Sequence, residues 1–94
     1  MEIILEKAEK ISNILKNFSN KNKLAILCFL GKDRKNVSEI LKKCSFSQSQ
    51  VSQFLNKLKL EKIVDCEKKW KEVFYYIIDN DTLVLIESLK KNFL

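Results

Sequence analysis

Hydrophobic and polar residues alternate along the chain with two different periods. Up to Leu60, apolar side chains recur three and four positions apart, which predicts amphipathic helices. After Leu60 the period changes to two, and β-branched and aromatic residues predict strands. The pattern predicts helices over residues 2–18, 21–30, 37–44 and 47–60, strands over residues 63–67 and 72–78, and a last helix after residue 79. The expected fold class is mainly α with a β-hairpin (α+β), in the order α-α-α-α-β-β-α.

Local signals mark where several of these helices begin and end. Asn36 with Glu39, and Ser47 with Gln50, have capping-box spacing, in which each side chain binds the backbone amide of the other residue. Gly31 closes the second helix, because glycine readily takes the left-handed conformation that follows a helix. The third and fourth helices are joined by a tight turn at residues 45–46 and are followed by a hairpin, or wing, with a cationic tip. This arrangement predicts a helix-turn-helix.

The helix that begins at Ser47 has two different faces. Its apolar face follows the spacing i, i+3, i+4, i+7 and consists of Val51, Phe54, Leu55 and Leu58. The opposite face carries hydroxyl and amide groups, which donate and accept hydrogen bonds without a fixed charge. Such groups suit the reading of base edges in the major groove. The candidate base-reading residues are Gln48, Ser49, Ser52, Gln53 and Asn56.

The charge balance favours a polyanionic partner. Eighteen basic and twelve acidic residues leave a net charge of +6 and a pI near 9.3, although a generic basic protein would show the same balance. The backbone amides at the N-terminus of the fourth helix have no partner within the helix and are available to a phosphate. The candidate phosphate contacts, for which a solvated surface is the alternative, are Lys21, Lys23, Ser47, Lys57, Lys68, Lys69 and Lys71. We expect double-stranded DNA as the partner.

Enzymatic and membrane functions are not expected. The chain has no histidine, which removes Ser-His-Asp and Cys-His pairs and every zinc site that needs histidine. It has no apolar run near the length of a membrane span, and its acidic, amphipathic N-terminal stretch is unlike a signal peptide. Three cysteines do not make a disulfide framework and fit a reducing, cytoplasmic location. Cys28 and Cys44 are expected in the core, and Cys66 nearest to solvent, with a redox role for Cys28 or Cys66 as the alternative.

The first and last helices carry more apolar surface than one small domain needs to bury. In the first helix this surface is a stripe of Ile4, Ala8, Ile11, Leu15 and Phe18, which either wraps its own domain or pairs with a second subunit. We expect a homodimer whose interface includes Ile4, Ile11, Leu15, Leu85, Leu89 and Phe93. The chain is expected to be one domain, 1–94, with dimerisation helices at 1–18 and 79–94, a helix-turn-helix at 36–60 and a wing at 62–78.

The run from Ser47 to Leu55 resembles the Ser-Gln-x-x-Val-Ser-x-His-Leu signature of the ArsR/SmtB family of winged helix-turn-helix regulators. Supporting matches are Val37-Ser38-Glu39-Ile40 and Val73-Phe74-Tyr75-Tyr76. The resemblance covers residues 10–94, and within the family the chain is most similar to the thiol- or sulfide-responsive HlyU/BigR type. It implies a homodimeric transcriptional regulator, expected to be a repressor, on an inverted-repeat operator.

The chain departs from the family at its sensor positions. Metal-sensing members have cysteines where this chain has Asn36 and Ser38, and a further ligand where it has Leu41. The resemblance therefore implies no metal and no other cofactor. Thiol-responsive members pair the cysteine at position 28 with a second one, which falls near Leu94 in this chain.

Two other functions compete with sequence-specific repression. One is a winged-helix module for protein binding, with a patch of Trp70, Phe74 and Tyr76. The other is a regulator that displaces other DNA-bound proteins. We expect Trp70 to pack back on the hairpin, because an indole is costly to leave in water, and contact with deoxyribose is the alternative.

Overall fold

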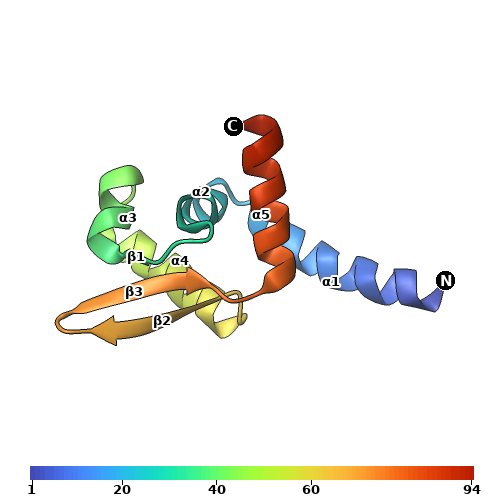
Figure 1. Ribbon diagram of the computed structural model, residues 1–94, viewed down its shortest axis with the longest axis horizontal. Helices are drawn as coiled ribbons and strands as arrows, with labels where there is room; N and C mark the ends of the chain where they lie inside the picture. Colours follow the sequence, from blue (N-terminus) through green and yellow to red (C-terminus); the bar gives the residue numbers. More distant parts are fainter.

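A computed structural model describes all residues, 1–94, and shows five helices and one three-stranded sheet (Figure 1). The predicted class, mainly α with a β-hairpin wing, is confirmed. The elements are α1 Glu2–Phe18, α2 Lys21–Leu30, β1 Lys35–Asn36, α3 Val37–Lys43, α4 Gln48–Leu60, β2 Val64–Lys69, β3 Glu72–Ile77 and α5 Asn80–Phe93.

Side-chain caps start the helices where the sequence places them. The Asn20 side chain accepts hydrogen bonds from two backbone amides in the first turn of α2. The capping boxes at Asn36 and Ser47 are both complete. Gly31 ends α2 with a φ of 51°, a conformation that a side chain would strain. The local signals therefore set the boundaries of α2, α3 and α4.

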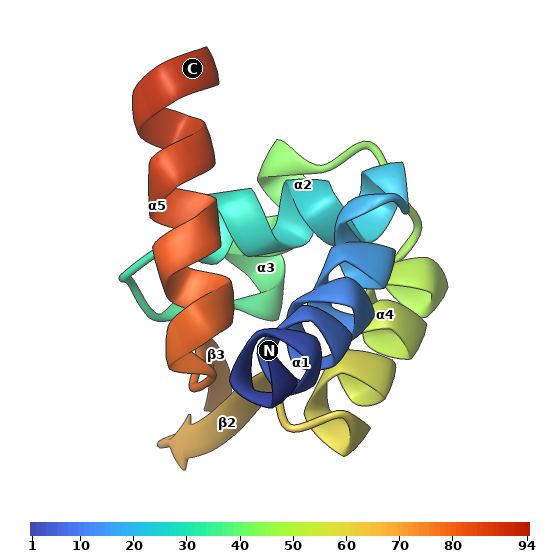
Figure 2. The same cartoon turned by 90° about the vertical axis from the view of Figure 1, so that its right-hand side faces the viewer.

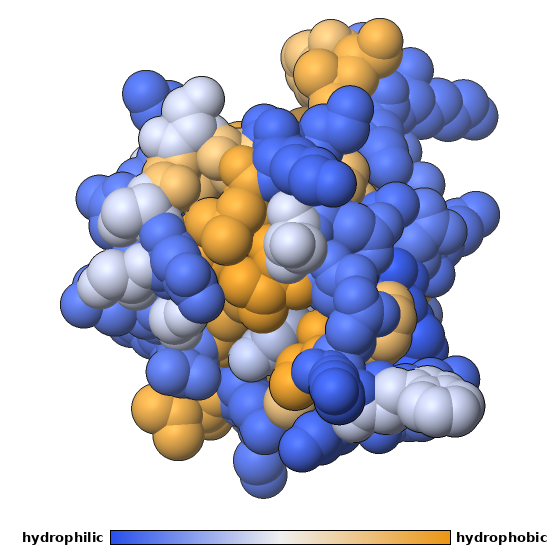
Figure 3. Space-filling view, turned by 90° about the vertical axis from the view of Figure 1, so that its left-hand side faces the viewer, coloured by the Kyte–Doolittle hydropathy of each residue, from blue (hydrophilic) through white to orange (hydrophobic).

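The core is built around α2. Ile26, Leu27 and Leu30 are fully buried on this helix. Side chains from α3, α4, β2 and α5 surround them, namely Ile40, Val51, Leu55, Leu58, Val64 and Ile86. The face of the molecule on which α3 lies is mainly hydrophilic, with an apolar area in its middle (Figure 3).

The sheet has the strand order β1-β3-β2, and both of its pairs are antiparallel. Strand β1 was not predicted, because residues 32–35 look like a charged loop in the sequence. It consists of Lys35 and Asn36, which pair with Tyr75 and Phe74 of β3. A two-residue strand has no periodicity of its own, and only its partner in the fold defines it.

The first strand of the wing ends two residues later than predicted, and the tip of the wing is more exposed. Strand β2 continues to Lys69, which pairs with Glu72, so that only Trp70 and Lys71 remain in the turn. Trp70 has a φ of 60°, as the first residue of some tight hairpin turns does. Its side chain is 96% exposed, so the prediction that it packs back on the hairpin is wrong.

Helix α1 projects from the body at the end opposite the wing tip (Figure 1). Residues 1–10 are all exposed, and the buried residues of α1 are Ile14 and Asn17 in its second half. Viewed from the N-terminal side, α1 lies between α5 and α4 (Figure 2). Ile4 is 66% and Leu15 is 45% exposed, so the chain leaves much of the predicted stripe uncovered.

Candidate nucleic-acid interface

Helix α4 presents a polar face to solvent. Its opposite face is held in the core by Val51, Leu55 and Leu58, which are fully buried. This anchoring sets the rotation of the helix about its axis: when the apolar face packs in the core, the opposite polar face must point to solvent. The structure places all five predicted base-reading residues on the exposed side: Gln48, Ser49, Ser52, Gln53 and Asn56.

The first turn of α4 leaves backbone donors free. The amide of Gln50 donates to Ser47 Oγ, and the amide of Ser47 donates to Gln50 Oε1. No hydrogen bond occupies the amides of Gln48 and Ser49. Free amides at a helix N-terminus are suited to bind an anion such as a phosphate.

The turn between α3 and α4 is fixed by aromatic packing. The rings of Phe46 and Phe54 meet edge to face, with their centroids 6.3 Å apart. Cys44, the C-cap of α3, is buried beside them in the core cluster. Burial raises the pKa of the Cys44 thiol, so this cysteine is a small core residue, as predicted.

The wing carries exposed cations around its tip. Lys68, Lys69 and Lys71 are all exposed. Arg34, in the loop before β1, braces the other end of the wing: its guanidinium lies 3.9 Å from the centroid of the Tyr76 ring, and its Nη1 lies 2.7 Å from Glu67 Oε2. No sequence pattern predicts this role of Arg34, because its partners lie on strands that are distant in the sequence.

Another contact holds the wing, and it joins strand β2 to α4. Lys59 Nζ donates to Cys66 Sγ on β2 at 3.2 Å. The hydrogen bond and charge of Cys66 raise the pKa of Lys59. Cys66 is half-buried, and the sequence had offered no partner for it. Cys28 is also half-buried, and burial raises the pKa of its thiol, while Lys90 opposes this change.

The predicted phosphate contacts fall into two groups. Ser47, Lys21, Lys57 and the three wing lysines are exposed. Lys23 is an exception: it is 7% exposed, because it packs between α1 and α4. Lys23 is therefore not a surface cation, which corrects its place among the candidates.

The predicted dimer contacts lie on α1 and α5. Ile4, Leu15 and Phe93 are exposed, by 66%, 45% and 79%. Ile11, Leu85 and Leu89 are half-buried. Further exposed apolar residues on the same two helices are Ile3, Leu5 and Val84.

No group of three or more histidine, cysteine, aspartate or glutamate side chains is arranged to hold a metal ion. None of the helices combines the length and the apolarity that crossing a bilayer would require.

Comparisons with known proteins agree with this geometry. Residues 20–65 match the family model described as bacterial regulatory protein, arsR family. The chain is 32% identical over 78 residues to the transcriptional activator HlyU of Vibrio cholerae. The aligned residues cover 83% of this chain and 72% of that protein.

Solved structures show the same fold over almost the whole chain. The crystal structure of the transcriptional regulator HlyU from Vibrio vulnificus superposes with a TM-score of 0.92 at 27% identity, covering 99% of this chain and 97% of that one. The transcriptional repressor BigR from Xylella fastidiosa has a TM-score of 0.88 at 26% identity, covering 99% and 95%.

Proposed function

The chain belongs to the arsR family of bacterial regulatory proteins and is a DNA-binding transcriptional regulator, and we propose that it acts as a homodimer on an inverted-repeat operator. This family consists of transcriptional regulators and not of enzymes.

The observation that carries the proposal is the uncharged polar face of α4. Six exposed side chains along this helix carry hydroxyl or amide groups, and the five besides the capping Gln50 are the candidate base readers. Gln53 and Asn56 can each make two hydrogen bonds to adenine, which favours half-sites that contain A and T. A face that served only solubility would instead carry lysine and glutamate, as the exposed side of α1 does.

Contacts to the DNA backbone would come from both sides of α4. The free amides of Gln48 and Ser49 can bind one phosphate at the helix N-terminus. Lys21 and Lys57 are exposed cations of α2 and α4, and the wing lysines can follow the adjacent minor groove. These contacts would position the protein without reading the sequence.

Assembly into a dimer would use α1 and α5. The free half of α1 carries Ile3, Ile4 and Leu5, each more than 60% exposed, which is unfavourable for a chain that stays alone in water. The wing lies at the opposite end of the molecule (Figure 1). Pairing through α1 and α5 would therefore leave both wings free, with the two α4 helices in successive major grooves about 34 Å apart.

We propose repression as the outcome of binding, through occupation of the promoter. Relatives with an activator name and with a repressor name have the same fold as this chain. The second candidate is therefore a regulator that displaces other DNA-bound proteins. A footprint that overlaps the promoter supports repression, and one that lies upstream supports displacement.

The protein-binding module is less well supported. Its predicted patch needs Trp70, Phe74 and Tyr76 together, but Arg34 covers the face of Tyr76, and Phe74 is half-buried. Only Trp70 of the three is fully available. A single exposed indole is a small area for a stable protein interface.

A selection of bound DNA from a random pool tests the proposal. We expect an inverted repeat, and a mass for the complex that corresponds to two chains per duplex. Insertion of five base pairs between the half-sites should abolish tight binding, because it turns the half-sites to opposite sides of the duplex. Enrichment of a single half-site, or binding that ignores the insertion, would contradict the proposed dimer.

A further inference from the structure

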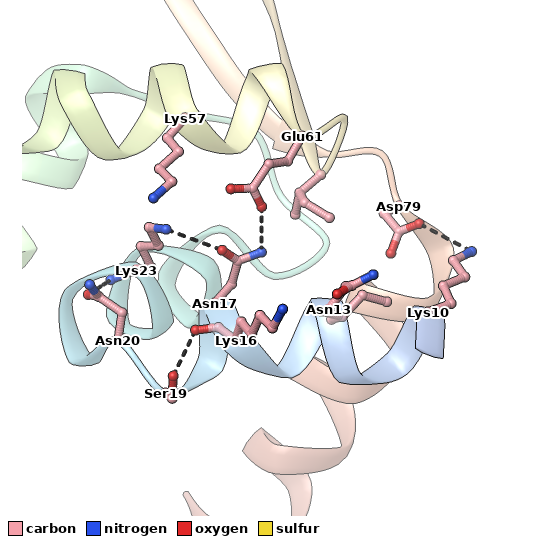
Figure 4. Close-up of a pocket in the computed structure, with 12 residues that line it drawn as sticks. Lys10, Asn13, Lys16, Asn17, Ser19, Asn20, Lys23, Lys57, Glu61 and Asp79 are labelled. Carbon is pink, nitrogen blue, oxygen red and sulfur yellow. Dashed lines mark hydrogen bonds and ion pairs between the residues drawn. The ribbon is translucent and has the colours of Figure 1, made fainter. Parts of the chain in front are cut away.

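A polar groove of about 810 Å³ lies between α1, the start of α2 and the end of α4 (Figure 4). Of its twelve lining residues, only two are hydrophobic. The charged lining residues are Lys10, Lys16, Lys23, Lys57, Glu61 and Asp79. Lysines outnumber carboxylates, so the groove has an excess of positive charge.

Both carboxylates in the groove already have partners. Asp79 lies 3.7 Å from Lys10 Nζ and also caps α5 through Thr82. Glu61 Oε2 accepts a hydrogen bond of 3.0 Å from Asn17 Nδ2. Lys23 and Lys57 have no carboxylate oxygen within the 4.0 Å of an ion pair.

Lys23 is the unusual member of this group. The residue as a whole is 7% exposed, and its Nζ has one hydrogen bond, of 3.3 Å, to Asn17 Oδ1. An ammonium group has three donors, and burying one without a counter-ion is costly. Two donors of Lys23 are therefore left for a group that is not part of the chain.

Lys57 makes this environment more positive. The ammonium ends of Lys23 and Lys57 point toward one another across the groove (Figure 4). Burial, and then the charge of Lys57, lower the pKa of Lys23, while Glu61 opposes the change. An acceptor with negative charge between the two ammonium groups would replace this repulsion with two attractions.

We propose that the groove binds a small free anion that carries phosphate or carboxylate groups, held between Lys23 and Lys57. The polar lining does not fit a mainly apolar ligand, and the volume lies in the range of small-molecule sites. Two asparagines of α1 also line the groove: Asn17, whose amide binds Lys23 and Glu61, and Asn13, which lies nearer Lys10 (Figure 4). No residue of the polar face of α4 is used.

Binding at this place would act on the DNA-binding helix. Lys57 and Glu61 belong to α4 and to its C-cap, so an anion in the groove contacts the end of that helix. It would also withdraw Lys57 from a DNA phosphate and place negative charge near the duplex. The anion would lower operator affinity, and this consequence alone rests on the proposed function.

Nuclear magnetic resonance of the full chain without DNA tests the site. Pyrophosphate and citrate are the probes, titrated at constant ionic strength with chloride as the reference. The side-chain amides of Asn13 and Asn17 should shift saturably with at least one probe. Lys23→Met should weaken this binding about tenfold or more, because a hydrogen bond to a charged group is lost.

Two further variants keep the test decisive. Lys57→Met removes an exposed side chain, so this variant should fold even if Lys23→Met does not. Its affinity for the anion should also fall about tenfold. Lys32→Met, in the loop after α2, removes the same charge outside the groove and should bind as the wild type does.

Three results would overturn the anion site. They are the absence of saturable shifts with both probes, equal shifts in the wild type and in Lys57→Met, and shifts at the groove amides with a DNA duplex but with neither free anion. The last result would assign the groove to the DNA backbone. The duplex is titrated in a separate sample. Because the titrations with pyrophosphate and citrate contain no DNA, their failure leaves the proposed DNA-binding function intact.

Discussion

Ser47 and Gln50 bind each other's backbone at the start of α4, with both hydrogen bonds 3.2 Å long. This pair fixes where α4 begins, and it leaves the amides of Gln48 and Ser49 free. The same two residues therefore affect the stability of the fold and the proposed contact with a phosphate, and substitutions can separate these effects.

Ser47→Ala should lower the free energy of unfolding by about 0.5 to 2 kcal/mol, because the N-cap acceptor is lost. Ser47→Asp keeps an acceptor and should keep most of the stability, but it places a negative charge where a phosphate is expected. Urea unfolding and operator titrations measure both effects. Ser38→Asp, at an exposed position in the first turn of α3, adds the same charge and is the control. Wild-type DNA affinity in Ser47→Asp would contradict the phosphate site.

Lys69→Ala tests the wing. Lys69 is exposed on β2 next to the turn. If it neutralises one phosphate, its loss should weaken binding to all sequences to a similar degree and reduce the slope of log K against log salt by about one unit. Glu72, the strand partner of Lys69, offers a control of opposite charge, since Glu72→Gln should not weaken binding. An unchanged slope in Lys69→Ala would exclude Lys69 from the contact.

Ile4→Glu tests the assembly. Ile4 is 66% exposed on the projecting half of α1, so the substitution should leave the fold of the single chain intact. A charge buried in the proposed interface is costly and should weaken the dimer about tenfold or more. Sedimentation measures the change. Leu60→Glu, at an 84% exposed position of α4, is the control and should not alter the assembly. Equal sedimentation of Ile4→Glu and the wild type would move the interface elsewhere.

Cys44 gives a prediction for the alkaline range. Burial raises the pKa of its thiol above the ordinary value of 9.0. As the pH rises past 9.0, the unfolded chain loses this proton first, so the folded state binds more protons and its stability falls with pH. The difference in stability between the wild type and Cys44→Ala should therefore shrink from pH 8 to pH 10. Urea unfolding at several pH values measures it, and a constant or growing difference would contradict the burial effect.

Local signals in the sequence were enough for much of the fold and the site. The capping residues Asn36 and Ser47 act within one turn of their own helix, so the starts of α3 and α4 were predictable. The apolar spacing of Val51, Leu55 and Leu58 set the rotation of α4 and with it the exposed polar face.

Features that depend on distant residues were not predictable in this way. Strand β1 exists because Lys35 and Asn36 meet β3. Lys23 is buried because α1 and α4 close over it, and no pattern around position 23 signals this. Trp70 was expected to be covered, but the two-residue turn holds it outward with a positive φ.

The most direct measurement is the affinity of Gln53→Ala for the selected operator and for random DNA of the same length. If the polar face of α4 reads bases, the variant should lose about 1 to 3 kcal/mol of binding free energy on the operator and much less on random DNA. Lys69→Ala, measured in the same way, should lose a similar binding free energy on both duplexes. Equal losses of Gln53→Ala on the two duplexes would show that this face does not read the sequence.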